Sequence, residues 1–172
     1  FVWKVGEEQV VVGNLSLCVC VCVCVCAVMF VSGVASIPVM LFLVYLPHVI
    51  KQIVIAKAFG GVKNIEPRHF MANIEKDKSP AAGYVRRAAA AHNNSLEAFS
   101  FWAAAVLLSI VTGVDAALVS LTADIFLTLR FFYNFIYIVN VDRVTAGLRS
   151  LLWLGSLLCS VFLMYTAAST AQ

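Results

Sequence analysis

Residues 86–108 read RRAAAAHNNSLEAFSFWAAAVLL, and this stretch already sets the class of protein. Two arginines and a short polar run lead into alanines, aromatic residues and leucines. A helix here is therefore polar at one end and compatible with lipid at the other. The apolar run ends near Gly113, and the helix that it predicts, Tyr84 to Thr112, exceeds the about 20 residues that a bilayer crossing requires.

The composition of the whole chain agrees with a membrane protein. Of its 172 residues, 62% are hydrophobic and only 12% are charged. Soluble globular proteins have about 45–50% apolar and about 25% charged residues. A soluble chain of this length could not hide so much apolar surface. Intrinsic disorder is excluded for the same reason, as is a nucleic acid partner bound through many phosphate contacts.

Further apolar runs predict three more spans, one before the helix at Tyr84 to Thr112 and two after it. The link TGVD between the second and third spans is so short that these two helices should be antiparallel neighbours. The polar stretch at about 57–83 should be a long loop. We therefore expect an all-α integral membrane protein, a four-transmembrane-helix bundle over residues 28–172. The additional spans are Val28 to Ile50, Ala116 to Asn140 and Thr145 to Ala168.

The amino-terminal 27 residues have a different character. Five of the six cysteines alternate with valine in CVCVCVCVC, residues 18–26. Strict alternation would place all five side chains on one face of a strand, where they cannot surround one metal ion. A TG dinucleotide repeat encodes the same alternation. We expect residues 1–27 to be a low-complexity leader outside the fold, with Met29 as an alternative start, and we expect no metal site.

Basic residues predict how the bundle is oriented. Ten Lys and Arg side chains flank the links after the first and third spans, whereas the opposite face has Lys4 alone. By the positive-inside rule, the face with ten basic residues is cytoplasmic. These residues are Lys51, Lys57, Lys63, Arg68, Lys76, Lys78, Arg86, Arg87, Arg143 and Arg149.

Polar side chains form a stripe on each of two predicted spans. At about 100° per residue, Arg87, Asn94 and Glu97 share a quarter of one helix, and His92 points to its far side. On the next span Arg130, Tyr133, Asn134 and Tyr137 share a face. Charged side chains inside a membrane indicate function, because burying them in hydrocarbon is unfavourable.

Structural roles remain open as alternatives for these residues. Glu97 and Arg130 could form an ion pair that joins two helices, or could contact a ligand. His92 taken alone is more often a packing residue. Arg149 or Arg143 at the start of the last span could anchor that helix at the headgroups or hold an anion.

Three motifs in the same order resemble the MAPEG family, membrane-associated proteins in eicosanoid and glutathione metabolism. The first motif is an arginine, then H/Q-x-N-x-x-E and an aromatic-rich apolar run. The second is Arg-x-x-Tyr-x-x-x-Tyr, and the third is LRSLLW at the start of the last helix. The residues that fill the first two motifs are Arg87, His92, Asn94, Glu97 and Phe99, and then Arg130, Tyr133 and Tyr137.

This resemblance implies a glutathione-dependent membrane transferase, with peroxidase activity in some members, that acts on hydrophobic electrophiles or lipid-derived substrates. Glutathione would be the co-substrate and no metal would be needed. The resemblance also implies a homotrimer in the lipid bilayer; if the source is a eukaryote, the membrane would be the endoplasmic reticulum or another intracellular membrane. Arg149, or alternatively Arg143, would stabilise the glutathione thiolate. The tripeptide would be bound by Arg87, His92, Asn94, Glu97, Arg130, Tyr133 and Tyr137.

One departure from the family pattern favours a second hypothesis. Glutathione-active members carry another arginine three residues after the position of Arg87, where this chain has Ala90. Loss of a bidentate carboxylate ligand should weaken glutathione binding. The alternative function is therefore that of a non-enzymatic membrane protein that binds a lipid.

Overall fold

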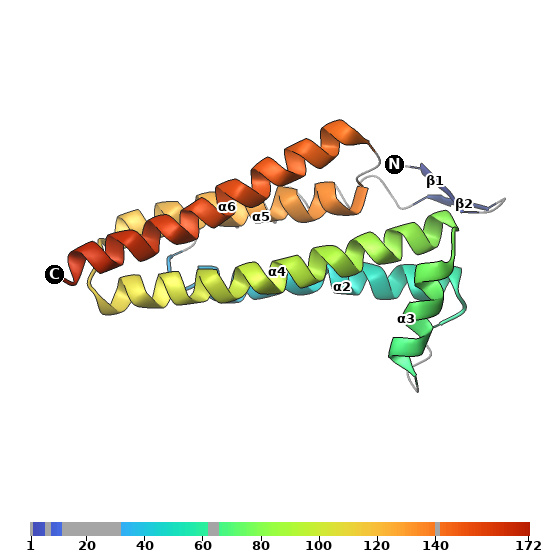
Figure 1. The fold of residues 1–172 in the computed structure, drawn as a ribbon, viewed down its shortest axis with the longest axis horizontal. Helices are drawn as coiled ribbons and strands as arrows, with labels where there is room; N and C mark the ends of the chain where they lie inside the picture. The colour runs from blue at the N-terminus through green and yellow to red at the C-terminus, as the bar shows by residue number, and fades with distance from the viewer. Residues whose placement is uncertain (1, 6–7, 12–31, 62–65, 140–141) are drawn as a thin grey trace.

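A computed structural model describes residues 2–5, 8–11, 32–61, 66–139 and 142–172. Four long helices run up and down beside one another, and a short helix crosses one end (Figure 1). All four are long and apolar enough to span a membrane, which confirms the predicted four-span bundle. The spans are α2 (Ser36–Ala58), α4 (Pro80–Val111), α5 (Ala116–Val139) and α6 (Arg143–Thr170), and the short helix is α3 (Pro67–Lys76).

Two short strands, β1 (Val2–Val5) and β2 (Glu8–Val11), pair in antiparallel register near the amino terminus. They lie within the segment that we expect to be a leader. The alternating cysteines at 18–26 lie outside the described residues. The assignment of residues 1–27 as a leader stays a prediction.

The first span lies further along the chain than the hydropathy pattern predicts. It ends at Ala58 rather than Ile50, because polar residues such as Lys51 do not stop a helix. Gly60 and Gly61 follow with φ of 70° and 115°, conformations that glycine adopts readily. The second span starts at Pro80 instead of Tyr84. Ser79 caps it by accepting a hydrogen bond from the backbone N–H of Ala82 at 3.2 Å.

The polar stretch predicted as a loop contains helix α3. Phe70, Met71 and Ile74 form its apolar side and pack against a small cluster at the ends of α2 and α4. Arg86 on α4 binds the last turn of α3 by donating hydrogen bonds to the carbonyls of Ile74 (3.0 Å) and Asp77 (2.7 Å). The apolar residues in α3 have helical spacing. The low mean hydropathy of the whole polar stretch conceals this pattern.

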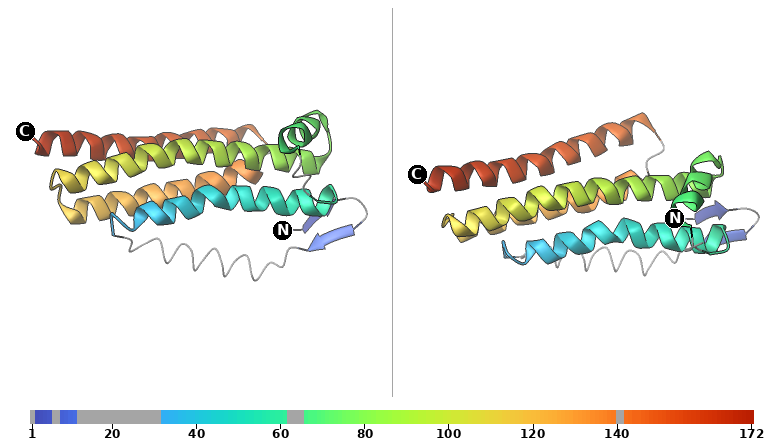
Figure 2. Two further views of the ribbon diagram at one scale, coloured as in Figure 1. Left: turned by 90° about the horizontal axis from the view of Figure 1, so that it is seen from below. Right: turned by 60° about the horizontal axis from the view of Figure 1, so that its bottom comes forward.

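The spans have two distinct ends. At one, Gly113 with φ of 74° lies in the turn between α4 and α5, which are antiparallel neighbours as predicted. At the other, α2 and α5 end and α4 and α6 begin; we name it the basic end, since both basic links lie there (Figure 1). Helix α4 contacts α2, α5 and α6. Helix α6 diverges from α4 towards the basic end (Figure 2).

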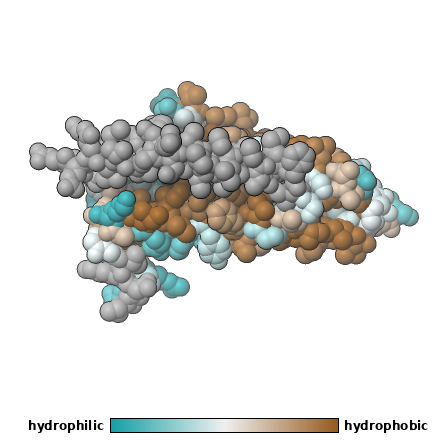
Figure 3. All heavy atoms as spheres, turned by 180° about the vertical axis from the view of Figure 1, so that it is seen from behind, coloured by the Kyte–Doolittle hydropathy of each residue, from teal (hydrophilic) through white to brown (hydrophobic). Residues whose placement is uncertain are grey.

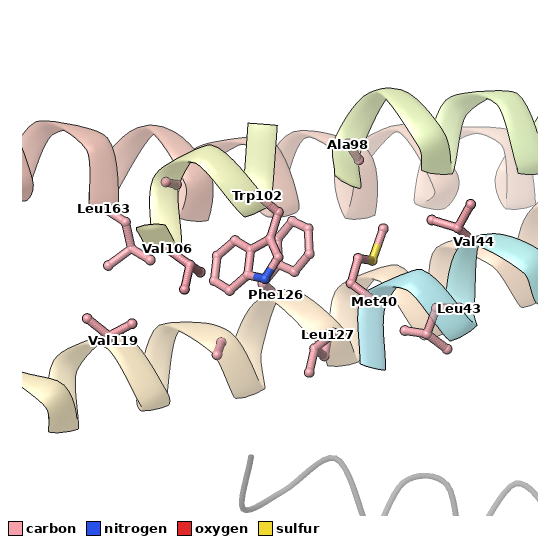
Figure 4. Close-up of a cluster of buried hydrophobic side chains, with 12 residues drawn as sticks. Met40, Leu43, Val44, Ala98, Trp102, Val106, Val119, Phe126, Leu127 and Leu163 are labelled. Atoms are coloured by element: carbon pink, nitrogen blue, oxygen red, sulfur yellow. The ribbon is translucent and has the colours of Figure 1, made fainter. Parts of the chain in front are cut away.

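The main apolar core lies between the middle of the bundle and the α4–α5 turn. The Trp102 indole stacks on the Phe126 ring, with centroids 4.0 Å apart (Figure 4). The indole N–H donates a hydrogen bond to Ser36 Oγ at 2.9 Å. Helix α6 contributes to the core only from its second half, since its first buried residue is Ser156. Large hydrophobic side chains are exposed on all four spans, and they form brown patches between the two ends on the face shown in Figure 3. A bilayer would cover them.

Candidate functional site

Arg130 lies at the centre of the polar residues between α4, α5 and α6. It is 2% exposed, and its Nη1 donates a hydrogen bond to Asn94 Oδ1 at 3.3 Å. Its guanidinium carbon lies 5.1 Å from the ring centroid of Tyr133 and 5.8 Å from that of Phe126. The Arg130 Nε is buried without a hydrogen-bond partner. A buried cation with an unused donor is poorly satisfied by the protein alone.

A small pocket of about 60 Å³ is lined in part by Arg130. Glu97 also lines the pocket but is itself exposed, so it faces outwards from the bundle. Within the described part of the chain, no ion pair joins Glu97 to Arg130. The structural ion pair considered above is therefore absent from this structure. The remaining lining residues are Asn94, Ala98, Phe101, Trp153, Leu157 and Ser160.

A second group of side chains lies towards the basic end. The rings of Tyr133 and Tyr137 meet edge to face with centroids 5.5 Å apart. The guanidinium carbon of Arg149 on α6 lies 4.5 Å from the Tyr137 ring centroid. Cations stacked on aromatic faces keep their N–H groups available at the edge. An unbroken series of ring contacts thus links Arg130 on α5 to Arg149 on α6.

Arg87 contacts the end of α5 next to Tyr137 in sequence, and one of its N–H donors already has an acceptor there. Its Nε donates a hydrogen bond to the carbonyl of Ile138 at 2.8 Å, which ties α4 to the end of α5. Its guanidinium carbon lies 4.4 Å from the ring centroid of Tyr84. Arg143, the other candidate on α6, is the first residue of that helix and is exposed. Of the two arginines on α6, Arg149 is the one in contact with Tyr137.

His92 lies on the other side of α4. Its Nδ1 is hydrogen-bonded to the carbonyl of Val44 on α2 at 2.8 Å, and its ring centroid is 5.1 Å from that of His48. The structure therefore does not bring His92 together with the other predicted site residues. Its neighbours instead agree with the packing role that was left open for it.

Asn134 also turns away from the pocket, although we predicted that it shares a face with Arg130. Both of its amide atoms are used in bonds to α2 and α4. By contrast, Trp153, Leu157 and Ser160 line the pocket and were not among the predicted residues. The sequence could have indicated them, because they follow Arg149 at steps of four, four and three residues and therefore lie on the same face of the helix.

The charge balance of the site favours an anion. Arg87, Arg130 and Arg149 are the cations, and Glu97 is the acidic residue on the same side of the bundle. In the described residues, no group of three or more His, Cys, Asp or Glu side chains could hold a metal ion.

Asp142 holds the start of the site helix α6. Its carboxylate accepts hydrogen bonds from the Thr145 N–H at 2.8 Å and from the Thr145 hydroxyl at 2.7 Å. These bonds lower the pKa of the Asp142 carboxyl, with the backbone N–H as the larger cause. The first turn of the helix that carries Arg149 is therefore capped by a charged side chain.

Comparison with known proteins gives one result that agrees with this architecture. A family model described as MAPEG family matches residues 29–169, which is most of the chain and includes all four spans. Comparison with curated proteins and with solved structures found no match. The motifs on α4, α5 and α6 lie within the matched residues. The chain is an integral membrane protein and belongs to the MAPEG family, membrane-associated proteins in eicosanoid and glutathione metabolism.

Proposed function

We propose that this protein is a glutathione-dependent membrane transferase, with peroxidase activity at the same site. The observation that carries the proposal is Arg130, a buried arginine that lines a pocket and whose Nε has no hydrogen-bond partner. Arg149 and Arg87 lie towards the basic end on the same side of the bundle. A small anion with several carboxylates suits this arrangement, and glutathione has two carboxylates and one amino group.

The binding roles follow from the charges of the residues. Arg130 and Arg87 would bind the two carboxylates, and Glu97 would bind the amino group. Asn94 already accepts a hydrogen bond from Arg130 and would hold that guanidinium in place. Tyr133 and Tyr137 would contact the peptide backbone through their hydroxyl groups. His92 has no part in this proposal.

Arg149 would stabilise the thiolate of the bound tripeptide. A free thiol has a pKa of about 8.5, and a fixed cation in a partly dry cleft favours the anion. In the transfer reaction, the thiolate sulfur forms a bond to an electrophilic carbon, and the leaving group departs with its bonding electrons. The thiol proton passes to water beforehand. In the peroxidase reaction, two glutathione molecules reduce a hydroperoxide to an alcohol and water and form glutathione disulfide.

A homotrimer fits the geometry of the isolated protomer. Glu97 is exposed on a helix that crosses the membrane, where a carboxylate facing lipid would be unfavourable. The pocket of about 60 Å³ is also too small for a tripeptide. A neighbouring subunit against this face of α4 would cover Glu97 and enlarge the site. The basic end would then open to the cytoplasm, in an intracellular membrane.

The experiment compares two arginines on the same helix. Purified protein in lipid nanodiscs is assayed with glutathione and a chlorodinitrobenzene. Arg149→Ala should lower kcat/KM about a hundredfold, the scale of losing one preorganised charge-stabilising group, whereas Arg143→Ala should change it less than about twofold. An unchanged rate in Arg149→Ala would refute the assigned role.

The absence of a second arginine at Ala90 supports a rival function, the binding of a lipid without thiol chemistry. Calorimetric titration of the wild-type protein with glutathione separates the two. The transferase proposal requires saturable binding that is weakened about a hundredfold in Arg130→Met. Complete absence of binding would favour the lipid-binding protein.

A further inference from the structure

Pro47 leaves one backbone carbonyl of α2 without its usual partner. Proline has no N–H, so residue 47 cannot donate the helical hydrogen bond to the carbonyl four residues earlier, that of Leu43. Both Pro47 and Leu43 are buried in the membrane-spanning part of the bundle. In hydrocarbon, a freed carbonyl must find another donor.

Asn134 on α5 supplies that donor. Its Nδ2 donates a hydrogen bond to the carbonyl of Leu43 at 2.9 Å. Its Oδ1 accepts a hydrogen bond from the hydroxyl of Ser95 on α4 at 2.7 Å. Asn134 is 2% exposed and Ser95 is fully buried. One amide therefore joins three membrane helices through two bonds of good length.

The position of Asn134 on α5 gives these bonds a consequence for the site. Asn134 follows Tyr133 directly and lies one turn from both Arg130 and Tyr137. A bond to α2 and another to α4 fix how far α5 can rotate about its own axis. We propose that Asn134 is a positioning residue, and that it uses the carbonyl freed by Pro47 to aim the polar side chains of α5 at α6. This inference rests on the proposed glutathione reaction.

A purely structural role for the same contacts would have different effects. Interhelical hydrogen bonds in membranes stabilise a fold whether or not a site lies nearby. If Asn134 did no more than that, its loss would lower the thermal midpoint in proportion, and the surviving folded protein would have normal chemistry. If it positions α5, the contact between Tyr137 and Arg149 changes, and so does the ionisation of bound glutathione.

The sharpest variant is Pro47→Ala. An alanine there restores the N–H that bonds the Leu43 carbonyl within α2. The Asn134 amide then has to share that oxygen with a helical donor, so its bond to α2 is weakened although its own side chain is untouched. Helix α2 itself should not be weakened, because a helix-interior proline is replaced by a good helix former. We expect kcat/KM for glutathione to fall about fivefold while the thermal midpoint stays level or rises.

Two further variants break the same connection from other helices. Asn134→Leu removes both hydrogen bonds and should lower kcat/KM for glutathione about tenfold, and Ser95→Ala should lower it about threefold. In each variant the pH profile of kcat/KM should shift to higher pH, because the thiolate is less well stabilised.

Two matched controls make the same kinds of substitution at residues that have no hydrogen bond to Asn134. Pro38→Ala makes the same change in the first turn of α2, at an exposed position. Ser109→Ala removes a buried hydroxyl of α4 that bonds within its own helix, to the Ala105 carbonyl at 2.8 Å. Both controls should keep the wild-type pH profile and stay within about twofold of its kcat/KM.

The outcomes are separable. Normal kcat/KM and pH profile in both Pro47→Ala and folded Asn134→Leu would overturn the inference. If the wild type binds no glutathione, the proposed function fails by itself. The inference is then judged by spin labels at Phe132→Cys on α5 and Leu158→Cys on α6, in a background with serine at the native cysteines. Their distance must change in Pro47→Ala and not in Pro38→Ala, and an unchanged distance in both would refute the positioning role.

Discussion

Helix α4 has polar side chains on two sides, and the two sets differ in how completely they are bonded. Towards α2, His92 and Ser95 have partners on neighbouring helices, and Asn134 completes the Ser95 bond from α5. On α2 itself, His48 Nδ1 and Gln52 Oε1 are buried without a partner, but neither residue carries the fixed charge of an arginine. Towards α6, Arg130 has a buried Nε without a partner, and Glu97 is exposed within a membrane-spanning helix. We name these the α2-facing set and the α6-facing set. The first joins helices, and the second retains unused binding capacity.

The difference teaches how to distinguish structural from functional polar groups inside a membrane. A satisfied interhelical hydrogen bond contributes about 0.6 kcal/mol on average and up to about 1.7 kcal/mol. An unsatisfied buried charge is unfavourable by several times that amount. A protein that keeps such a charge therefore has a reason other than its own stability. Loss of His92 from the α2-facing set should lower stability alone, whereas loss of Ser95 or Asn134 should also change the orientation of α5. Loss of the α6-facing set should affect binding.

The largest effect should come from Arg130→Met in the α6-facing set. Glutathione affinity should fall about a hundredfold, since a buried charge-assisted contact is lost. The thermal midpoint should not fall, because an incompletely bonded buried cation is replaced by an apolar side chain of similar length. Calorimetry and thermal unfolding of the detergent-solubilised protein measure both quantities. Trp102→Ala, with an expected loss of about 3–5 kcal/mol, is the control for damage to the core.

A smaller effect should separate two residues that lie two positions apart on α4. Asn94→Leu should weaken glutathione binding about tenfold with little change in stability. His92→Leu should do the reverse, with a loss of about 1–2 kcal/mol of stability and unchanged affinity. The same two measurements apply. Weaker glutathione binding in His92→Leu would break the division into two sets.

Two adjacent arginines extend the comparison to the basic end. Arg86 bonds carbonyls in the last turn of α3, whereas Arg87 donates a hydrogen bond to the Ile138 carbonyl, next to Tyr137 in sequence. Arg86→Ala should raise amide hydrogen exchange in α3 and leave glutathione affinity alone. Arg87→Ala should lower that affinity about fivefold and leave exchange in α3 unchanged. Equal effects of the two variants on affinity would show that the distinction fails there.

The smallest effect concerns Asp142 at the start of α6. Its pKa is lowered from the ordinary value of 3.8 by hydrogen bonds from Thr145. The stabilisation is therefore complete above pH 3.8 and is lost as the pH falls through the lower pKa of the folded state. Asp142→Ala should lower the thermal midpoint slightly at neutral pH, and the difference from wild type should vanish in strong acid. Asp142→Asn keeps an oxygen acceptor and should remove most of the pH dependence.

The four spans could be predicted because length and hydropathy along the chain are sufficient for that purpose. The link at 112–115 also predicted which helices are antiparallel neighbours. The end of the first span could not be found in this way, since Lys51 and Gln52 look like a boundary. Their side chains are partly buried, and the helix continues to Ala58. Helix α3 was missed because its few apolar residues are surrounded by polar ones, so the mean hydropathy of the stretch is low and predicts a loop.

The site was predictable in part. Helical periodicity and the family motifs predicted Asn94, Glu97 and Arg130 as site residues, and all three line one pocket in the structure. Periodicity shows which residues share a face, but it does not show which neighbouring helix that face meets. Tyr133 and Asn134 are about 100° apart on α5, and the first faces the site while the second faces α2 and α4. Pro47, which frees the carbonyl that Asn134 binds, lies 87 residues before Asn134 in the sequence.

Most side chains in the first half of α6 are exposed. Val144 and Leu151 there are 81% and 66% exposed, and both Phe101 and Trp153 line the pocket and reach the outer surface. In a bilayer, acyl chains would cover the α6 side chains that lie outside the proposed subunit contact. A nonpolar solute would then reach the pocket laterally, past Trp153, at its concentration in the lipid. Diluting proteoliposomes with buffer would leave that supply almost unchanged, whereas adding empty lipid that mixes with them would reduce it.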